Sequence, residues 1–578
     1  MKKINLLAIN ILLLSLVLAG CSGQSAEVQV STKDPNTTNH VSDDSNNLSK
    51  EEKAELLRKE REELEIQRKS EMGEFYVPLP PLGQEKSRNT VKAKALYLTA
   101  NVAGFDFKEE DINYYAEYIR SISGKSGKPA DTSRISEVNK LEKALGICEA
   151  TEINALVIDV KNDDGVVAWN SDIEIVNQIK SNSKAPLKNY DKLFNYLKEK
   201  DIYRIARIVA FKDPYFAEVK SDHAIQLKSG GAYKDYSGKT WVNPFDEYVW
   251  KYQIAISKEA ALRGFDEIQY DYVRFPDSAA YYNPITDFPG RNGRDKDEGI
   301  EQFLKYASSE LEPYNVHLSA DVFGVITRSW DDKPEDIGQT WRKISNQVEY
   351  ICPMIYPSHY GTGIYGFKVP DQYPYDVVRL ALMEGLERNA AQKKPGIIRP
   401  WVQGFTAPWI KGYIQYDAKA ISDQLVASME LGVDEYIIWN ASNNYDPMSF
   451  FYHNRIKTNI RQVEEDVLLR TPEIALKKYL DAEKNKKYSQ IYLLTPITER
   501  QEDFDEFVLG IEKSQLTLKN YEILSIQKSG DGNYMATVNA EYSSNAGSAT
   551  MKEANYKIIL ENDVYKVIKP ELAWKTAQ

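Results

Sequence analysis

The chain has 578 residues and a formal net charge of −12. This acidic balance excludes nucleic acid as the expected partner, because phosphate binding needs clustered positive charge. The 38 Tyr and 9 Trp, against 5 His, offer flat apolar faces with a polar tip, which suit stacking on sugar rings as well as core packing.

Residues 1–21 have the pattern of an export signal. "MKKINLLAINILLLSLVLAGC" begins with two lysines, continues with an apolar run and ends in Leu18-Ala19-Gly20-Cys21. Small residues directly before a cysteine resemble the bacterial lipoprotein box, which implies cleavage before Cys21 and acylation of that residue. An ordinary signal peptide or a membrane-spanning anchor is the alternative, but the run is short for a span. We therefore expect the chain on the extracytoplasmic face of the cell membrane, anchored by lipid.

Residues 22–90 predict a disordered tether followed by a charged spacer helix. Ser, Thr, Asn and Asp dominate residues 22–47, which have little apolar surface to bury. "LSKEEKAELLRKEREELEIQRKSE" predicts a helix capped by Ser49, with opposite charges three and four residues apart. Its thin apolar stripe favours a solvated spacer over a coiled coil. The prolines of residues 76–83 end this helix.

Residues 91–460 alternate between strand-like and helix-like segments. The apolar runs of strand length are "KALYLTAN" (94–101), "INALVIDVK" (153–161), "YRIARIVAF" (203–211), "FDEIQYDYVRF" (265–275), "VHLSADVFG" (316–324), "VEYICPMIY" (348–356), "GIIRPWVQGF" (396–405) and "DEYIIWNAS" (434–442). Amphipathic segments separate them. Eight such units predict an α/β fold of the (β/α)8 TIM-barrel type. A doubly wound sheet also alternates, but no glycine-rich nucleotide loop follows the first strand at Asn101.

Residues 468–578 predict a small α+β domain. A helical segment suited to begin at Thr471 and Pro472 is followed by alternating strands, with turns at Gly530-Asp531-Gly532 and at residues 562–563. This pattern resembles the cone-shaped NTF2-like domains. A domain boundary at this point predicts a protease-sensitive joint at residues 461–465.

The stretch "GFDEIQYDYVRFP", residues 264–276, carries three carboxylates in a predicted strand. Side chains of a barrel strand alternate between the interior and the helix layer, so Glu267, Gln269 and Asp271 share one face. The intervening apolar residues favour the helix layer, so the polar set points into the barrel, with Asp271 near its mouth. A solvated edge strand would also tolerate carboxylates, but a closed barrel has no edges.

Similar placements recur at the ends of the other predicted strands. Asp159 ends the second strand with Lys161 on the same face, and the face of Arg207 depends on the register of the third strand. The candidate catalytic residues are Asp271, Asp321, Glu267 and Asp159, and the candidate substrate-binding residues are Arg207, Arg274, Tyr356, His359, Trp401, Gln403, Trp439 and Asn440. A single acid in a barrel is often a structural ion-pair partner, and this alternative stays open for Asp159 and Glu267.

The motifs "INALVIDVKNDDGVV", "RIARIVAFKDP", "WVNPF", "GFDEIQYDYVRFP", "SADVFG", "PMIYPSHYG", "IRPWVQGF" and "IIWNASNNY" occur in this order. Together they resemble a bacterial family of barrel-fold glycoside hydrolases, long described as a domain of unknown function and distantly similar to the α-amylase superfamily. The resemblance implies that Asp271 occupies the nucleophile position. It places Asp321 on the fifth strand, where amylase-like enzymes usually carry Glu, so the identity of the proton donor stays open.

Glycoside cleavage needs one carboxyl group that donates a proton and a second that attacks or activates water. A separation of about 5 Å gives retention and roughly 6.5–9.5 Å gives inversion. Neighbouring strands lie about 4.8 Å apart, so Asp271 and Asp321 can meet the shorter spacing. The expected substrate is a cell-surface or extracellular polysaccharide. The alternative is a non-catalytic glycan-binding or envelope-scaffold lipoprotein.

Other signals in the sequence are weak, and we expect neither a cofactor nor a metal ion. "GTGIYG", residues 361–366, has dinucleotide-loop spacing but leads to prolines rather than into a helix. "DVKNDDG" has Lys161 at a ligand position of a calcium loop and lacks the terminal Glu. The histidines show no close pair that indicates zinc.

Overall fold

The computed structural model describes residues 49–82, 91–328, 332–390, 392, 394–451, 471–486, 488–499, 504–514, 516–544, 547–561 and 564–570. The predictions for the signal segment and Cys21, for the tether over residues 22–47, and for the joint at residues 461–465 lie outside these residues. So does the predicted turn at residues 562–563.

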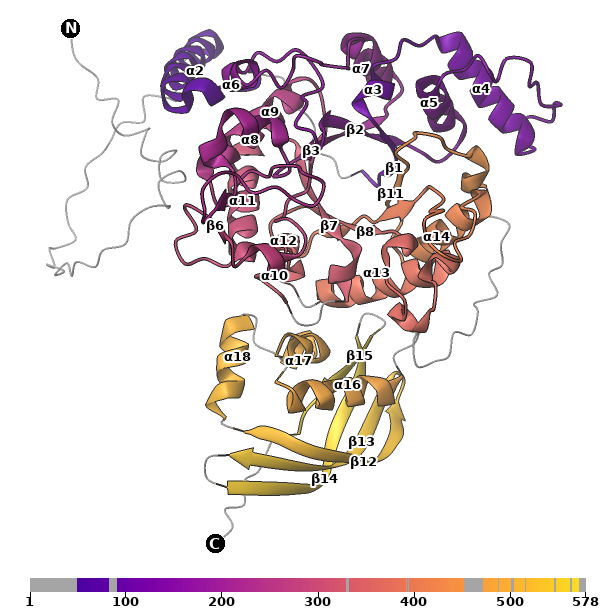
Figure 1. Ribbon diagram of the computed structural model, residues 1–578. Helices are drawn as coiled ribbons and strands as arrows, with labels where there is room; N and C mark the ends of the chain where they lie inside the picture. Colours follow the sequence, from indigo (N-terminus) through magenta and orange to yellow (C-terminus); the bar gives the residue numbers. More distant parts are fainter. Residues whose placement is uncertain are drawn as a thin grey trace, which may run out of the picture. The chain divides into compact units, whose positions relative to one another are not determined.

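Within the described part of the chain, eight parallel strands close into a barrel surrounded by helices (Figure 1). They are β1 (Lys94–Leu98), β2 (Ala155–Lys161), β3 (Tyr203–Val209), β5 (Glu267–Asp271), β7 (His317–Phe323), β8 (Tyr350–Ile355), a seventh strand in two pieces, β9 (Ile397–Ile398) and β10 (Trp401–Gln403), and β11 (Tyr436–Trp439). Pairing of β10 with β8 and of β11 with β1 closes the ring. Pro400 interrupts the seventh strand because it has no N–H to donate to a ladder. All eight predicted strands, and the TIM-barrel fold, are confirmed.

The helices of the barrel follow the strands in the predicted alternation. They are α3 (Ala100–Ala103), α4 (Glu109–Ile122), α5 (Lys140–Ala150), α6 (Glu174–Gln178), α7 (Tyr190–Glu199), α8 (Pro214–Val219), α9 (Glu247–Leu262), α10 (Ala279–Tyr282), α11 (Lys296–Leu311), α12 (Trp341–Ser345), α13 (Pro374–Ala390) and α14 (Ala418–Glu430). Side-chain caps set several of their starts: Asn139 and Glu142 form a capping box at α5, and Asp417 caps α14. A small two-stranded sheet, β4 (Gln226–Leu227) with β6 (Thr286–Asp287), joins the loops that follow β3 and β5.

Strand β5 shows the alternation that the sequence predicts. Tyr270 points to the helix layer, where its hydroxyl lies 2.6 Å from that of Ser257 on α9 and its ring contacts Phe303 of α11. The residues on either side of it point into the barrel, as predicted. This inward set is polar because it meets other polar side chains inside the barrel rather than the apolar helix faces.

Strand β2 departs from the prediction at its last residue. Asp159 aligns with Arg207 of β3, but Lys161 aligns with Ile208, so one extra residue is inserted between them. Such a bulge turns the following side chain to the other face. Lys161 therefore points to the helix layer, where its ammonium lies 2.6 Å from Asp213, and neither side chain is exposed. The prediction that Lys161 shares the face of Asp159 is wrong for this reason.

The helix predicted for this segment is present as α2 (Lys50–Met72). The Glu52 N–H donates to Ser49 Oγ at 3.2 Å and the Ser49 N–H donates to the Glu52 carboxylate at 2.8 Å, which is a capping box. No described helix, α2 included, has the length and apolar composition needed to cross a membrane.

The segment after α2, residues 74–79, packs into the barrel although the sequence placed it in a linker. Phe75 and two further apolar side chains of this segment are buried, and the Phe75 ring meets that of Tyr248 on α9 edge to face at 4.7 Å. The hydroxyl of Tyr314 donates to the carbonyls of Val77 and Pro78. The packed part of the barrel domain thus begins before residue 91.

The C-terminal domain contains helices and an antiparallel sheet, which confirms its predicted α+β class. Its elements are α16 (Pro472–Lys484), α17 (Tyr488–Leu494), α18 (Phe504–Lys513), β12 (Thr517–Gly530), β13 (Asn533–Ser544), β14 (Gly547–Glu561) and β15 (Val564–Ile568). The strands pair in chain order, and Figure 1 shows this sheet in yellow. The predicted turn between β12 and β13 is present, with Gly532 at a φ of +72°.

Candidate active site

Every strand of the barrel contributes a side chain to one cluster near its carboxyl end. The cluster consists of Tyr97 (β1), Asp159 (β2), Arg207 (β3), Asp271 (β5), Asp321 (β7), Tyr356 (directly after β8), Trp401 (β10) and Trp439 (β11). The carboxyl ends of the strands are where TIM barrels carry their functional groups. Seven of these residues are candidates from the sequence, and Tyr97 is the addition. A barrel-facing Tyr one residue before the end of the first strand is the signal that identifies it.

Arg207 is the centre of the charged part of the cluster. Its Nε and Nη2 donate to Asp271 Oδ2 at 3.0 and 2.5 Å, and its Nη1 donates to Asp159 Oδ1 at 2.6 Å. The other oxygen of Asp159 accepts a hydrogen bond from the Tyr97 hydroxyl at 2.6 Å. Burial lowers the pKa of Arg207, but the two carboxylates outweigh it and raise the pKa above its usual value.

The backbone next to Asp271 is held in an unusual conformation. Tyr272 has a φ of +48°, in the left-handed region that bulky residues rarely adopt. This turn directs the Tyr272 N–H to Asp271 Oδ1 at 2.6 Å, so both oxygens of the carboxylate accept hydrogen bonds. Such a residue stores strain of about 1–3 kcal/mol, which is typical of functional sites. Nothing in the sequence marks this conformation, so sequence reasoning missed it.

Asp321 has a different environment from Asp271. Its Oδ1 accepts a hydrogen bond from Trp401 Nε1 at 2.6 Å, and its Oδ2 has no hydrogen-bond partner among the described residues. The side chain has no exposed surface, and burial together with the nearby charge of Asp271 raises its pKa well above the usual value. Asp321 is therefore stabilised in its neutral, protonated form.

The register of β5 against β7 places these two acids side by side. Glu267 aligns with His317 and Tyr270 aligns with Ala320, so the next residue on each strand is Asp271 and Asp321. Neighbouring strands lie about 4.8 Å apart. Two adjacent carboxyl groups, one of which is stabilised in its protonated form, suit acid–base chemistry on a glycosidic bond.

Glu267 lies apart from this pair. It begins β5, about 13 Å along the strand from Asp271 at the usual rise per residue. Both of its oxygens accept hydrogen bonds from Arg399 Nη1 at 2.8 and 2.9 Å, and Arg399 Nε donates to Glu435 at 2.8 Å. Glu267 and Arg399 have no exposed surface. The structure thus favours the alternative of a structural ion pair for Glu267.

An aromatic wall borders the acids on one side. Trp439 lies 5.7 Å from Tyr356 and 5.0 Å from Phe405, measured between ring centroids. Phe405 in turn stacks on Trp409, whose side chain is exposed. His359 packs against Tyr356 and Phe405, and burial lowers its pKa. Phe405 and Trp409 were missed from the sequence, although three aromatics within the nine residues of "WVQGFTAPW" are a signal that identifies them.

Two candidate substrate-binding residues instead brace the loops of this wall. Gln403 is fully buried; its amide donates to Asp371 and its Oε1 accepts the Ser358 N–H at 3.0 Å. Asn440 accepts hydrogen bonds from the N–H and the hydroxyl of Ser442. Their polar groups are engaged within the protein, so they position the loops that carry His359 and Phe405.

Arg274 lies outside the Arg207 group. Its guanidinium lies 4.5 Å from the Phe323 ring centroid and 5.1 Å from that of Trp241, and it donates to the Phe275 carbonyl. It therefore supports the loop after β5.

Among the described residues no group of three or more His, Cys, Asp or Glu is arranged to hold a metal ion. Arg207 occupies the space between Asp159 and Asp271.

The family model described as "Putative glycosyl hydrolase domain" matches residues 131–445. A hypothetical protein from Ruminiclostridium thermocellum ATCC 27405 is 34% identical over 39% of this chain and 97% of that chain, with a TM-score of 0.30. The glycoside hydrolase domain of PgaB (BpsB) from Bordetella bronchiseptica is 13% identical over 62% of this chain and 98% of that chain, with a TM-score of 0.40. The spore cortex-lytic enzyme SleL from Bacillus megaterium QM B1551 is 13% identical over 65% of this chain and 76% of that chain, with a TM-score of 0.34.

No curated protein sequence matches the chain. The matched family segment contains seven of the eight barrel strands and every charged residue of the cluster. Since the match covers more than half of the 578 residues, the chain belongs to the family described as "Putative glycosyl hydrolase domain".

Proposed function

We propose that the barrel is a glycoside hydrolase that cleaves glycosidic bonds of a cell-surface or extracellular polysaccharide. The observation that supports this best is the contrast between two neighbouring acids. Asp271 accepts hydrogen bonds from a guanidinium and a backbone N–H, whereas Asp321 is buried and its pKa is raised by that burial. One ionised and one protonated carboxyl group are what the reaction needs at neutral pH.

In this mechanism Asp321 donates its proton from Oδ2, the oxygen without a partner, to the glycosidic oxygen. Asp271 attacks the anomeric carbon, and the spacing of adjacent strands favours this retaining route over inversion. In the second half-reaction Asp321, now ionised, takes a proton from the water that releases the sugar from Asp271. Because Asp321 is fully buried, the scissile bond must lie inside the barrel mouth. Tyr356 and Trp439 offer the aromatic faces that contact the sugar there.

The proposal is tested by incubating the purified full-length chain with a panel of polysaccharides and analysing the products by mass spectrometry. The wild-type chain should release shorter glycans from at least one polymer, and the Asp271→Asn chain should release none. A non-catalytic glycan-binding lipoprotein would instead bind glycan saturably and form no product at any pH. In that case Trp401→Ala would weaken binding and Asp271→Asn would not.

Trp401→Phe should move the alkaline limb of the pH–rate profile to higher pH. The indole N–H of Trp401 stabilises the charged form of Asp321 and lowers its pKa, so removing this donor raises the pKa further. The acid must be protonated to act, and the active fraction is lost as the pH rises through its pKa. Measuring kcat/KM against pH for wild type and Trp401→Phe checks this. A limb that stays in place or moves to lower pH would contradict the role of Asp321 as the acid.

We also propose that the C-terminal domain is NTF2-like, because helices precede an antiparallel sheet. We propose further that the protein is exported and anchored by lipid on Cys21. A lipoprotein carries more than one acyl chain, and two chains anchor a protein lastingly whereas one binds reversibly. Cys21→Ser should abolish palmitate labelling and should move the protein from the membrane fraction to the medium or leave it unprocessed. Fractionation and labelling unchanged from wild type would end the anchoring proposal.

A further inference from the structure

Exposed aromatic side chains lie on opposite walls of the barrel mouth. Trp409, in the loop after β10, is 68% exposed; Tyr236, in the loop after β3, is 77% exposed; and Tyr281, in α10 within the loop segment after β5, is 63% exposed. In the eight-strand ring, β3 is the third strand and the β9/β10 strand is the seventh, so these strands face each other across the barrel. All three loops leave the carboxyl ends of their strands, which is the end that carries the candidate active site.

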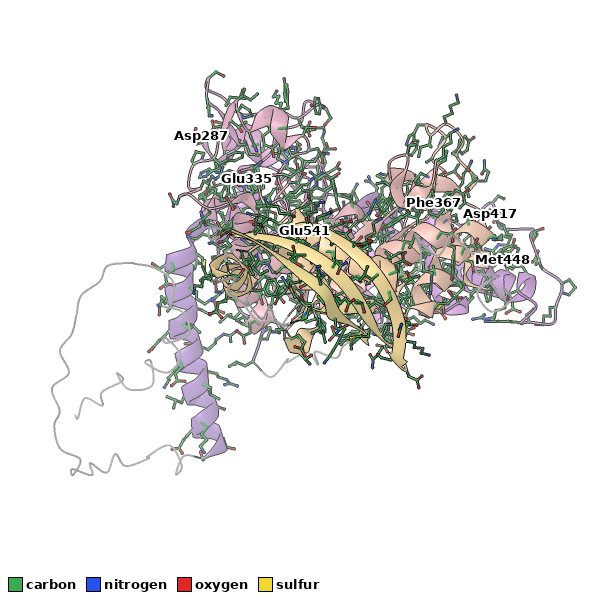
Figure 2. The ribbon with its side chains drawn as sticks, turned by 90° about the horizontal axis from the view of Figure 1, so that it is seen from below. Asp287, Glu335, Phe367, Asp417, Met448 and Glu541 are labelled. Atoms are coloured by element: carbon green, nitrogen blue, oxygen red, sulfur yellow. The ribbon has the colours of Figure 1, made fainter. Side chains whose placement is uncertain are left out.

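The two walls belong to separate projections of the barrel domain. Figure 2 shows Asp287 of β6 on one projection and Phe367, together with Asp417 at the start of α14, on another, on the same side of the domain. Strand β6 pairs with β4 in the insertion that carries Tyr236 and Tyr281, and the loop of Trp409 leads into Asp417. We name these the β4–β6 wall and the Trp409 wall.

The Trp409 wall is continuous with the candidate active site. The rings of Trp409 and Phe405 stack at 6.1 Å with an interplanar angle of 16°, and Phe405 meets Trp439 edge to face at 5.0 Å. Hydrogen bonds hold the loop in place: the Gln372 amide donates to the Gly412 carbonyl, and Asp371 accepts the N–H of Ile414. The exposed indole is therefore a fixed surface rather than the tip of a free loop.

The β4–β6 wall presents its tyrosines as a pair. The rings of Tyr236 and Tyr281 lie 6.1 Å apart with an interplanar angle of 31°. Tyr236 follows Asp235, whose carboxylate accepts the N–H of Ser237 and the indole N–H of Trp241. The Trp241 ring contacts that of Tyr272, the residue next to Asp271, at 5.8 Å. This wall is thus connected, through the Asp235–Trp241 hydrogen bond and the Trp241–Tyr272 ring contact, to the residue next to the carboxylate that we propose as the nucleophile.

Two lysines beside this wall are paired within the protein. Lys212 lies 3.3 Å from Asp163, and Lys239 lies 2.5 Å from Asp164. Lys234 and Lys411 are exposed beside Tyr236 and Trp409, so the two walls present aromatic faces and phenolic hydroxyls with single lysines beside them rather than a charged cluster. Flat apolar faces with a polar rim match the faces of uncharged sugar rings.

We infer that the barrel binds an extended polymer of uncharged sugar units across its mouth, in contact with both walls, and therefore cleaves internal bonds of the chain. This inference rests on the proposed function, and it adds the mode of attack and the class of substrate. A polymer that contacts both walls continues on each side of Asp271 and Asp321, so the bond between the two acids is an internal one. An enzyme that removes terminal sugars needs only one wall in contact with the polymer.

Binding is tested with the full-length Asp271→Asn chain by electrophoresis in gels that contain xylan, glycol chitin, mixed-linkage β-glucan or soluble starch, with alginate as the charged comparison. At least one neutral polymer should retard the protein, and alginate should not. Trp409→Ala and the double variant Tyr236→Ala/Tyr281→Ala should each weaken retardation by about threefold to tenfold. Leu262→Ala is the matched control, because Leu262 is an exposed apolar residue at the far end of α9; this change should leave the retardation as it is in the parent Asp271→Asn chain. Full retardation of both wall variants, or no retardation by any neutral polymer, would overturn the inference.

The mode of attack is tested with the active wild-type chain on the polymer that binds. Internal cleavage should lower the viscosity of the solution early, while few reducing ends have formed, and the first products should be long. Release of mono- or disaccharides from the start would overturn internal attack while the proposed hydrolase stands. Retardation that depends on both walls without any product would instead refute the hydrolase and leave the polymer-binding surface supported.

Discussion

Asp271→Asn should lower turnover of the polymer that the wild-type chain cleaves by at least about 10³-fold, because the amide keeps the shape of the side chain but neither attacks carbon nor activates water. The amide oxygen can still accept hydrogen bonds from Arg207, while the NH2 group faces the Tyr272 N–H and loses that bond, so the loss should appear mainly in kcat. Steady-state kinetics of the two chains give kcat and KM separately.

The matched control for this experiment is Asp163→Asn. Asp163 is also an acid in a loop at the carboxyl ends of the strands, but it is exposed and pairs with Lys212 at the surface. Its replacement should change turnover by less than about threefold, since exposed ion pairs contribute little. Equal turnover by the Asp271→Asn and wild-type chains would remove Asp271 from the mechanism.

Arg399→Met should lower the free energy of unfolding by about 3–5 kcal/mol, because it leaves two buried carboxylates without their cation. Arg399 lies between Glu267 and Glu435, and none of the three is exposed by more than a few per cent of its surface. Urea unfolding of the variant and of wild type at pH 7 measures the difference.

The loss of unfolding free energy caused by Arg399→Met should become smaller as the pH falls. Burial already raises the pKa of Glu435 in the wild-type chain, and removal of Arg399 raises it further. A folded state that binds more protons than the unfolded state is stabilised by lower pH. The difference in free energy of unfolding between the variant and wild type should therefore narrow below neutrality. Lys92→Met is the control: its ion pair with Asp434 is exposed, and its loss should change the free energy of unfolding little. A similar small cost for Arg399→Met would contradict a structural role for the Glu267 ion pair.

The barrel was predictable from the sequence because each strand is an apolar run and each inward polar residue recurs with a period of two. That period placed Asp271 and Asp321 inside the barrel and near its mouth, as the structure has them. It did not distinguish Asp271 from Glu267, which share a face and a charge. Two things separate these acids: their depth along the strand, and the side chains that reach them from distant strands. Asp271 lies beside Arg207, and Glu267 lies beside Arg399.

The remaining differences between the sequence predictions and the structure come from a single inserted residue or from tertiary packing. One inserted residue before Lys161 reverses its face, and a periodic pattern contains no mark of such an insertion. The positive φ of Tyr272 is imposed by the packing around it rather than by its own preference. The raised pKa of Asp321 depends on burial by strands up to 80 residues away, as its bond to Trp401 shows. Local sequence carries none of this information.

The packing of residues 74–79 on the barrel has a mechanical consequence. The rings of Phe75 and Tyr248 and the hydrogen bonds from Tyr314 fasten this segment to α9 and to the turn before β7. A pull on the chain ahead of Glu74 would therefore load these contacts in shear before any tension reached β1. Strand β1 pairs with β11 and β2 and closes the ring, so this segment protects the closure of the barrel from force applied through the N-terminal part of the chain.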